Sequence, residues 1–225
     1  VPKYNHSGIT GRTSITSGHN FLTMKKDNRK LLKSLKSDCA LVEVDFKSCE
    51  PFFYLKSNGY NIDSVKDVYH WISQNYQVDI KSRDKFKRGI LSMLYGANEY
   101  TTSKVMQIDL SIVKRIKEEL GINNLNSRLE KEFNSKGFIK NYYGRPITSN
   151  NNLVNYWIQS SAVDFCSLAF HRFYNKHDIK PCFFIHDSMT FEIEISRLPI
   201  LSDISVILEP VSNISIPVEF NIINK

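Results

Sequence analysis

Most of the chain alternates between apolar and polar positions with a helical period. Apolar residues recur every three or four positions in six segments, which predicts helices over residues 64–76, 81–96, 99–107, 109–120, 125–136 and 153–176. Shorter helices are expected over residues 50–57 and 198–208. The first 30 residues show no clear period and are rich in Gly, Ser, Thr, Asn and Lys, so we expect extended chain and turns there.

Four other segments have the short apolar runs of strands, over residues 39–46, 180–187, 189–195 and 216–223, and a small hairpin is expected over 138–147. Two of these runs deliver a carboxylate at their ends, Asp45 and Asp187. Neighbouring strands of one sheet can place the two side by side, and Mg²⁺ is bound by paired carboxylates together with substrate phosphates. Taken singly, each Asp is better explained as a turn residue at the end of a strand.

Segment 81–96 carries a stripe in which Arg83, Lys87, Leu91 and Tyr95 recur every fourth residue. In a helix these residues lie along one slowly drifting line. The cations can meet nucleotide phosphates, Arg through two oxygens and Lys as a point charge, while Leu91 and Tyr95 offer apolar surface to the sugar and base. The alternative is an amphipathic surface helix with Leu91, Leu94 and Tyr95 in the core. Together with the two aspartates, the stripe favours a site for phosphoryl transfer.

Five segments, in their order along the chain, resemble motifs of the family A DNA polymerases, the bacterial DNA polymerase I group. Residues 45–50 resemble motif A, residues 83–96 the finger helix of motif B, and His186 with Asp187 resembles motif C. Residues 10–14 resemble the family's T-G-R-x-S segment, and residues 155–164 its N-x-x-x-Q-x-x-A-x-D helix. Five motifs in the right order are a far more specific signal than any one of them.

The resemblance implies an α+β fold, a polymerase palm with an antiparallel β-sheet and an inserted helical fingers subdomain. Residues 1–59 would form the N-terminal part of the palm with motif A, residues 60–137 the fingers with the motif B helix, and residues 138–225 the C-terminal part of the palm with motif C. The implied activity is that of a DNA-directed DNA polymerase, which adds dNTPs to a primer 3′ end on a template. The expected partners are primer-template DNA and dNTPs, and the expected cofactor is Mg²⁺, as two ions.

The same resemblance assigns roles to individual residues. The metal ligands that it implies are Asp45, Asp187 and Phe46, and the catalytic residues are Asp45, Asp187 and Lys87, with Lys87 a candidate general acid for pyrophosphate. The implied nucleotide-binding residues are Arg83, Lys87, Leu91, Tyr95 and Glu50. Glu50 would exclude ribonucleotides, and Tyr95 would guard the templating position. The implied DNA-binding residues are Arg12, Asn155, Gln159 and His186, the last supporting the primer terminus.

Two departures from the family pattern affect this assignment. The family often has D-[IV]-H-T near the triphosphate, whereas here Tyr69 stands at the His position and His70 is shifted by one, which argues against His70 as a phosphate ligand. The family's helical thumb precedes the T-G-R segment, and here the chain starts shortly before it, at Val1 rather than Met. We therefore expect a thumb or exonuclease domain on a missing part of the chain or on another protein. The alternative function is a catalytically inactive primer-template binding module.

Composition and charge are consistent with a nucleic-acid partner. The chain has 30 Lys+Arg against 23 Asp+Glu, for a net charge of +7, which suits a polyanion but also fits a merely soluble basic protein. The four cysteines show no zinc spacing and are expected to be buried free thiols. No apolar run is long enough for a membrane span and no signal region is evident, so the expected location is intracellular, in the cytoplasm or in the host cytoplasm if viral, with an organelle also open.

Overall fold

The computed structural model describes residues 3–5 and 8–224, so Val1 and Pro2 lie outside the described residues. The chain packs into two compact units, Val1–Cys49 with Ala162–Lys225, called here the sheet unit, and Glu50–Ser161, called the helical unit. This division by packing does not coincide with the expected boundaries at residues 59 and 137. The assignment of palm and fingers to particular residue ranges therefore stays a prediction.

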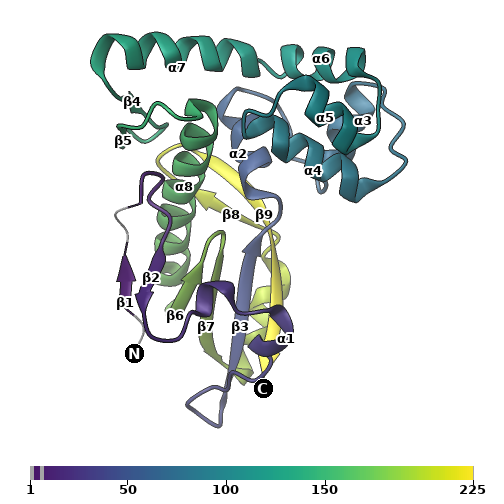
Figure 1. Ribbon diagram of the computed structural model, residues 1–225. Helices are drawn as coiled ribbons and strands as arrows, with labels where there is room; N and C mark the ends of the chain where they lie inside the picture. The colour runs from purple at the N-terminus through teal and green to yellow at the C-terminus, as the bar shows by residue number, and fades with distance from the viewer. Residues whose placement is uncertain (1–2, 6–7, 225) are drawn as a thin grey trace. The chain divides into compact units, whose positions relative to one another are not determined.

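The sheet unit is built on a five-stranded sheet with the order β6-β7-β3-β9-β8 (Figure 1). Every neighbouring pair in it is antiparallel. The strands are β3 (Cys39–Phe46), β6 (Lys180–Ile185), β7 (Ser188–Glu194), β8 (Val206–Glu209) and β9 (Ile214–Asn224). The central strand β3 is the mainly apolar run that the sequence predicted, interrupted only by Glu43 and Asp45, and all of its residues except Asp45 are buried.

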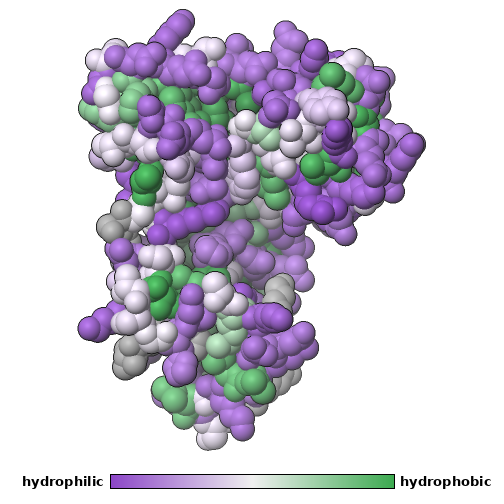
Figure 2. Space-filling model, viewed as in Figure 1, coloured by the Kyte–Doolittle hydropathy of each residue, from purple (hydrophilic) through white to green (hydrophobic). Residues whose placement is uncertain are grey.

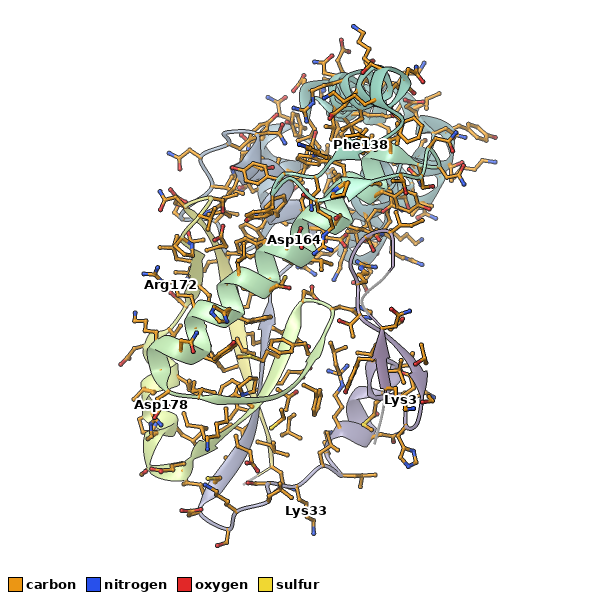
Figure 3. The ribbon with its side chains drawn as sticks, turned by 90° about the vertical axis from the view of Figure 1, so that its left-hand side faces the viewer. Lys3, Lys33, Phe138, Asp164, Arg172 and Asp178 are labelled. Atoms are coloured by element: carbon orange, nitrogen blue, oxygen red, sulfur yellow. The ribbon has the colours of Figure 1, made fainter. Side chains whose placement is uncertain are left out.

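One face of this sheet is covered by the C-terminal part of α8 (Leu153–His177), as Figures 1 and 3 show. Phe165 and Phe170 of the helix lie against Phe46, with ring centroids 5.2 and 4.8 Å apart, and Phe173 lies 6.2 Å from Phe191. Because side chains alternate along a strand, Phe46 on this face puts Asp45 on the other. The aromatic contacts thus orient β3 so that its carboxylate points away from the helix.

The described residues among the first 30 form more regular structure than the sequence predicted. β1 (Lys3–Asn5) pairs antiparallel with β2 (Ser14–Ser17), followed by the 3-10 helix η1 (Phe21–Thr23) and the short helix α1 (Lys26–Arg29). Arg29 of α1 forms an ion pair with Glu43 of β3. This contact fixes α1 on the sheet face that α8 leaves uncovered.

The helix predicted over residues 198–208 is present only in part, as a 3-10 helix rather than an α-helix, and its last residues form a strand. The structure has the 3-10 helix η2 (Ile195–Asp203), which contains Pro199, and then strand β8, which pairs with β9. Proline removes a backbone donor and is poorly tolerated inside an α-helix, and Ile and Val favour strands. Pairing with the long strand β9 therefore decides the conformation of this apolar segment.

The helical unit contains most of the helices that the sequence predicted. They are α2 (Cys49–Ser57), α3 (Val68–Asn75), α4 (Arg83–Leu94), α5 (Glu99–Met106), α6 (Leu110–Glu119) and α7 (Ile122–Lys136), followed by the hairpin of β4 (Ile139–Lys140) and β5 (Pro146–Ile147) and by the start of α8. Helix α3 begins later than the predicted start at residue 64, because Asp67 caps it. The cap is effective because the Asp67 carboxylate accepts hydrogen bonds from two backbone N–H groups.

Helices α4 and α5 approach each other closely at Gly89. A Cβ atom placed on Gly89 would come within 2.0 Å of the Met106 Cγ, and Met106 is buried. Only glycine leaves enough room for this contact. The face of α4 that packs into the unit therefore consists of Phe86, Gly89, Ile90, Met93 and Leu94.

The surface, the length of the apolar helices and the state of the cysteines complete the description. The face in Figure 2 is mainly hydrophilic, with hydrophobic residues in separate patches. No helix in the described part of the chain is both long and apolar enough to span a membrane. All four cysteines are free thiols, and Cys39, Cys49 and Cys166 are buried, but Cys182 is exposed rather than buried.

Candidate functional site

The sheet unit places Asp45 near the end of β3 and Asp187 in the turn that leads into the neighbouring strand β7. Asp45 lies opposite Ser188 in the pairing of β3 with β7, and the Phe46 N–H donates to the Asp187 carbonyl at 3.1 Å. Asp187 belongs to the two-residue turn between β6 and β7, closed by the pairing of Ile185 with Ser188. Both carboxylates are partly exposed. The two strands are neighbours in the sheet, and the role of the two carboxylates as metal ligands stays a prediction.

His186 is the other residue of this turn, and its backbone is left-handed, with φ of 53°. Such a backbone is uncommon for a residue other than glycine. The pKa of His186 is lowered, first by burial and then by the positive charges of Arg12 and Arg29. The negative charge of Asp187 acts in the opposite direction but does not outweigh them. The predicted DNA-binding residues Arg12 and His186 therefore lie close enough to Asp187 to share one electrostatic environment.

The same sheet face holds a buried polar group that sequence reasoning missed. Glu43, two positions before Asp45 on β3, pairs with Arg29 and accepts a hydrogen bond from the Ser188 Oγ at 3.3 Å. Arg29 Nε and Thr190 Oγ1 are buried without a hydrogen-bond partner among the residues that the structure describes. A glutamate inside an otherwise apolar run was the available signal, since buried charges require partners.

Asp45 and Asp187 offer too few donors for a metal ion that takes all its ligands from protein side chains, but they suit Mg²⁺. The described residues contain no group of three or more His, Cys, Asp or Glu side chains that could hold a metal ion. Mg²⁺ characteristically takes one or two carboxylates and completes its shell with water and substrate phosphates. Two carboxylates at adjacent strand ends are such a donor pair.

In the helical unit, the stripe on α4 is separate from the buried face of the helix. Arg83 is exposed, and Lys87, Leu91 and Tyr95 are partly exposed. Of the residues that the alternative interpretation placed in the core, only Leu94 is buried there. The stripe therefore remains accessible to a ligand, as the nucleotide-binding prediction requires.

The cations of the stripe contact Asp67, which caps α3, and Tyr69, which lies on α3. The sequence predicted no role for either residue. Arg83 Nε donates to the Asp67 carboxylate at 2.8 Å, and the Arg83 and Lys87 charges lie 5.7 and 5.9 Å from the centroid of the Tyr69 ring. Tyr69 is buried, whereas the neighbouring His70 is exposed. Tyr69 rather than His70 thus lies against the cations.

Tyr95, at the C-terminal end of α4, is held through both its side chain and its main chain. Its hydroxyl donates to the carboxylate of Glu50, the predicted ribonucleotide filter, and its carbonyl accepts from the Asn152 amide at 2.6 Å. A Cβ on Gly96 would lie 2.4 Å from Asn152 Oδ1, and Gly96 has a φ of +82°, so glycine is required next to Tyr95. These contacts bring two predicted nucleotide-binding residues together.

Asn155 and Gln159 lie one turn apart near the start of α8, and both are partly exposed. Asn155 Oδ1 is buried and has no hydrogen-bond partner in the described part of the chain. Nothing in the structure shows what they bind, so their DNA contacts stay a prediction.

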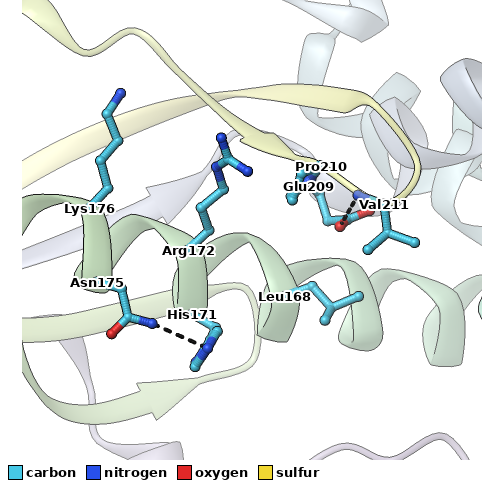
Figure 4. A pocket seen from close by; sticks show the side chains of 8 residues that line it. All are labelled: Leu168, His171, Arg172, Asn175, Lys176, Glu209, Pro210 and Val211. Atoms are coloured by element: carbon cyan, nitrogen blue, oxygen red, sulfur yellow. Dashed lines mark hydrogen bonds between the residues drawn. The ribbon is translucent and has the colours of Figure 1, made fainter.

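A shallow pocket of about 540 Å³ lies between α8 and the β8–β9 turn, lined by residues that include His171, Arg172 and Lys176 (Figure 4). Its carboxylate, Glu209, is already bonded to the backbone N–H groups of Val211 and Ser212, and His171 lies 3.2 Å from the amide of Asn175. The pocket is on the helix side of the sheet, opposite Asp45. It is not the candidate site.

Comparison with known proteins supports the fold. No protein-family model matches the chain, and no curated protein matches it in sequence. Among solved structures, the chain is similar to the POL domain of Pol1 from M. smegmatis, in complex with DNA primer-template and dNTP, with a TM-score of 0.71 and 16% sequence identity. The match covers 98% of this chain and 47% of the Pol1 chain, so this chain spans about half the length of the Pol1 chain. The chain thus has the α+β fold of a polymerase domain, as the sequence predicted.

Proposed function

We propose that this chain is the catalytic part of a template-directed DNA polymerase, similar to the family A enzymes, that adds dNTPs to a primer 3′ end. The observation that carries the proposal is the placement of Asp45 at the end of β3 and of Asp187 in the turn before the neighbouring strand β7, on a fold similar to a polymerase domain bound to primer-template and dNTP. Fold similarity alone would not identify the function. Partly exposed carboxylates at adjacent strand ends add the chemistry that nucleotidyl transfer requires.

In this proposal, Asp45 and Asp187, with the main chain of Phe46, hold two Mg²⁺ ions. Bound there, Mg²⁺ would lower the pKa of the primer 3′ hydroxyl and neutralise charge on the phosphates. The turn at His186 and Asp187 and the end of β3 position the two carboxylates relative to each other before substrate binds. Such preorganisation reduces the entropy lost when the reacting groups are brought together.

The helical unit would supply the groups that bind the nucleotide. Arg83 and Lys87 would bind the triphosphate, and Lys87 would also donate a proton to the departing pyrophosphate. Leu91 would contact the sugar and base, and Tyr95 would lie at the templating position. Glu50, held by the Tyr95 hydroxyl, would occupy the space that a ribose 2′ hydroxyl needs.

The DNA contacts would come from Arg12, Asn155, Gln159 and His186. The net charge of +7 supports binding to a polyanion. A thumb or exonuclease domain, supplied by further chain or by another protein, would add contacts to the duplex.

The proposal is tested by primer extension on a labelled primer-template with Mg²⁺, using templates that differ only in the next base. The expected result is addition of the complementary dNTP on each template. DNA binding without any extension would contradict the proposal and support the inactive binding module instead.

A further inference from the structure

The proposed function leaves Asp67 and Tyr69 without a role, although both contact the phosphate-binding cations. The two oxygens of Asp67 act in different ways. Oδ1 accepts from the backbone N–H groups of Tyr69 and His70, at 2.9 and 3.3 Å, and so caps α3. Oδ2 accepts from Arg83 Nε at 2.8 Å. The carboxylate therefore links the start of α3 to the start of α4.

The Tyr69 ring supports both cations of the stripe. Arg83 Cζ and Lys87 Nζ lie 5.7 and 5.9 Å from its centroid, within the range of cation–π attraction. Tyr69 is buried on α3, so its ring is a fixed surface. Lys87 makes no ion pair within the described residues, whereas Arg83 pairs with Asp67. One of the two predicted phosphate ligands is thus already occupied by an internal anion.

This internal ion pair can be displaced by a ligand. The Arg83 side chain is 57% exposed and that of Asp67 34%, so water and ligands reach the pair, and exposed ion pairs are weak. Burial raises the pKa of Asp67, but the hydrogen bonds from Arg83 and from His70 and Tyr69 outweigh it, and the net pKa is lowered. Asp67 is therefore ionised at neutral pH and competes with any phosphate that approaches Arg83.

We propose that Asp67 is an internal competitor for Arg83, released from it when a polyphosphate binds, and that the Tyr69 ring keeps Arg83 and Lys87 aligned during this exchange. This inference rests on the proposed nucleotide-binding role of the stripe. A ligand with several adjacent phosphates can bind both cations and displace Asp67, whereas a single phosphate gains less from the exchange. Asp67 and Tyr69 are thus positioning residues that favour polyphosphates over monophosphates.

Asp67→Asn separates the two roles of Asp67, because asparagine is an equally good helix cap but carries no charge. We expect this variant to bind inorganic tripolyphosphate about two- to fivefold more tightly than wild type, the range that an exposed ion pair allows. The measurement is calorimetric titration of the full chain without metal or DNA. The matched control is Asp84→Asn, which removes the same charge in the first turn of α4 but leaves the Asp67–Arg83 pair in place. Equal affinity changes in the two variants would contradict the proposal that Asp67 competes with phosphate for Arg83.

The role of the ring is tested with two substitutions of Tyr69. Tyr69→Leu should weaken tripolyphosphate binding by about two- to fivefold, and Tyr69→Phe, which keeps the ring, should restore it. Equal affinities of the Leu and Phe variants would overturn the role of the ring. These titrations require no catalysis, so their outcome is independent of primer extension: failed extension with the expected affinity pattern would reject only the proposed function.

Discussion

At the scale of single residues, the sheet face that carries Asp45 depends on the ion pair between Arg29 and Glu43. Both side chains are almost fully buried, at 14% and 7% exposure. Glu43 also accepts from the hydroxyl of Ser188, which lies opposite Asp45. The sequence did not predict this pair, because Arg29 lies in a segment without periodicity and its partner on β3 is set only by the tertiary fold.

We expect Arg29→Met to lower the free energy of unfolding by about 3–5 kcal/mol, because it leaves the buried Glu43 carboxylate without its counter-ion. The measurement is urea denaturation. Lys30→Met is the matched control, since Lys30 pairs with Asp27 at the surface and should cost less than about 1 kcal/mol. Adding Glu43→Gln to Arg29→Met should recover part of the loss, and equal effects of Arg29→Met and Lys30→Met would contradict this account.

Glu50 and Tyr95 give a second prediction at this scale. Glu50→Ala should raise the ratio of ribonucleotide to deoxyribonucleotide incorporation, because it opens space beside the sugar. Tyr95→Phe should raise the ratio less, since it only removes the hydroxyl that holds the Glu50 carboxylate. Single-nucleotide incorporation efficiencies measure both ratios. An unchanged ratio in an active Glu50→Ala variant would show that Glu50 does not discriminate between the sugars.

At the scale of elements, the sequence predicts best where one conformation accounts for the whole pattern. The run 39–46 became β3 with the predicted bounds, and helix α4 was placed to within two residues at each end. Prediction failed where a short apolar run fits both helix and strand, as at 198–208, and where an internal contact selects the cap, as at Asp67. The candidate site shows the same limit: Asp45 and Asp187 were found from strand ends, but Tyr69, Asp67 and Arg29 depend on tertiary contacts.

The contact between α4 and α5 gives an element-scale prediction. Alanine is the better helix former by about 1 kcal/mol, yet Gly89→Ala should destabilise the protein by about 1–2 kcal/mol because its Cβ overlaps Met106. In a Met106→Ala background, Gly89→Ala should become neutral or stabilising. Thermal unfolding of the four proteins of this cycle measures the coupling, and additive effects would contradict the close approach of the helices.

The end of α8 gives a pH-dependent prediction. Burial and the charges of Lys176 and Arg197 lower the pKa of His177. The unfolded chain, with an ordinary histidine pKa of about 6.5, then binds more protons, so stability is full above about pH 6.5 and falls as the pH drops below it. His177→Gln should reduce this loss between pH 7.5 and 5.5 in urea denaturation. His171→Gln, an exposed histidine on the same helix, is the control and should keep the wild-type loss.

At the scale of the whole molecule, the two units carry different parts of the proposed reaction. The sheet unit holds Asp45 and Asp187 with Arg12 and His186, and the helical unit holds the cationic stripe with Glu50, Asn155 and Gln159. Strand pairing positions Asp45 and Asp187 in the sheet unit, and the contact of Asp67 with Arg83 links α3 to α4 in the helical unit. The proposed function requires both sets, because metal binding and nucleotide binding are separate parts of one transfer reaction.

The most direct test of this account measures primer extension and DNA binding together for Asp45→Asn and Asp187→Asn, with Asp203→Asn as a control at an exposed position of η2. We expect each of the first two variants to lose extension while binding primer-template as wild type does, because affinity for DNA comes mainly from phosphate contacts. Asp203→Asn should keep both properties. Extension at the wild-type rate by either Asp45→Asn or Asp187→Asn would contradict the central claim that these two carboxylates perform nucleotidyl transfer.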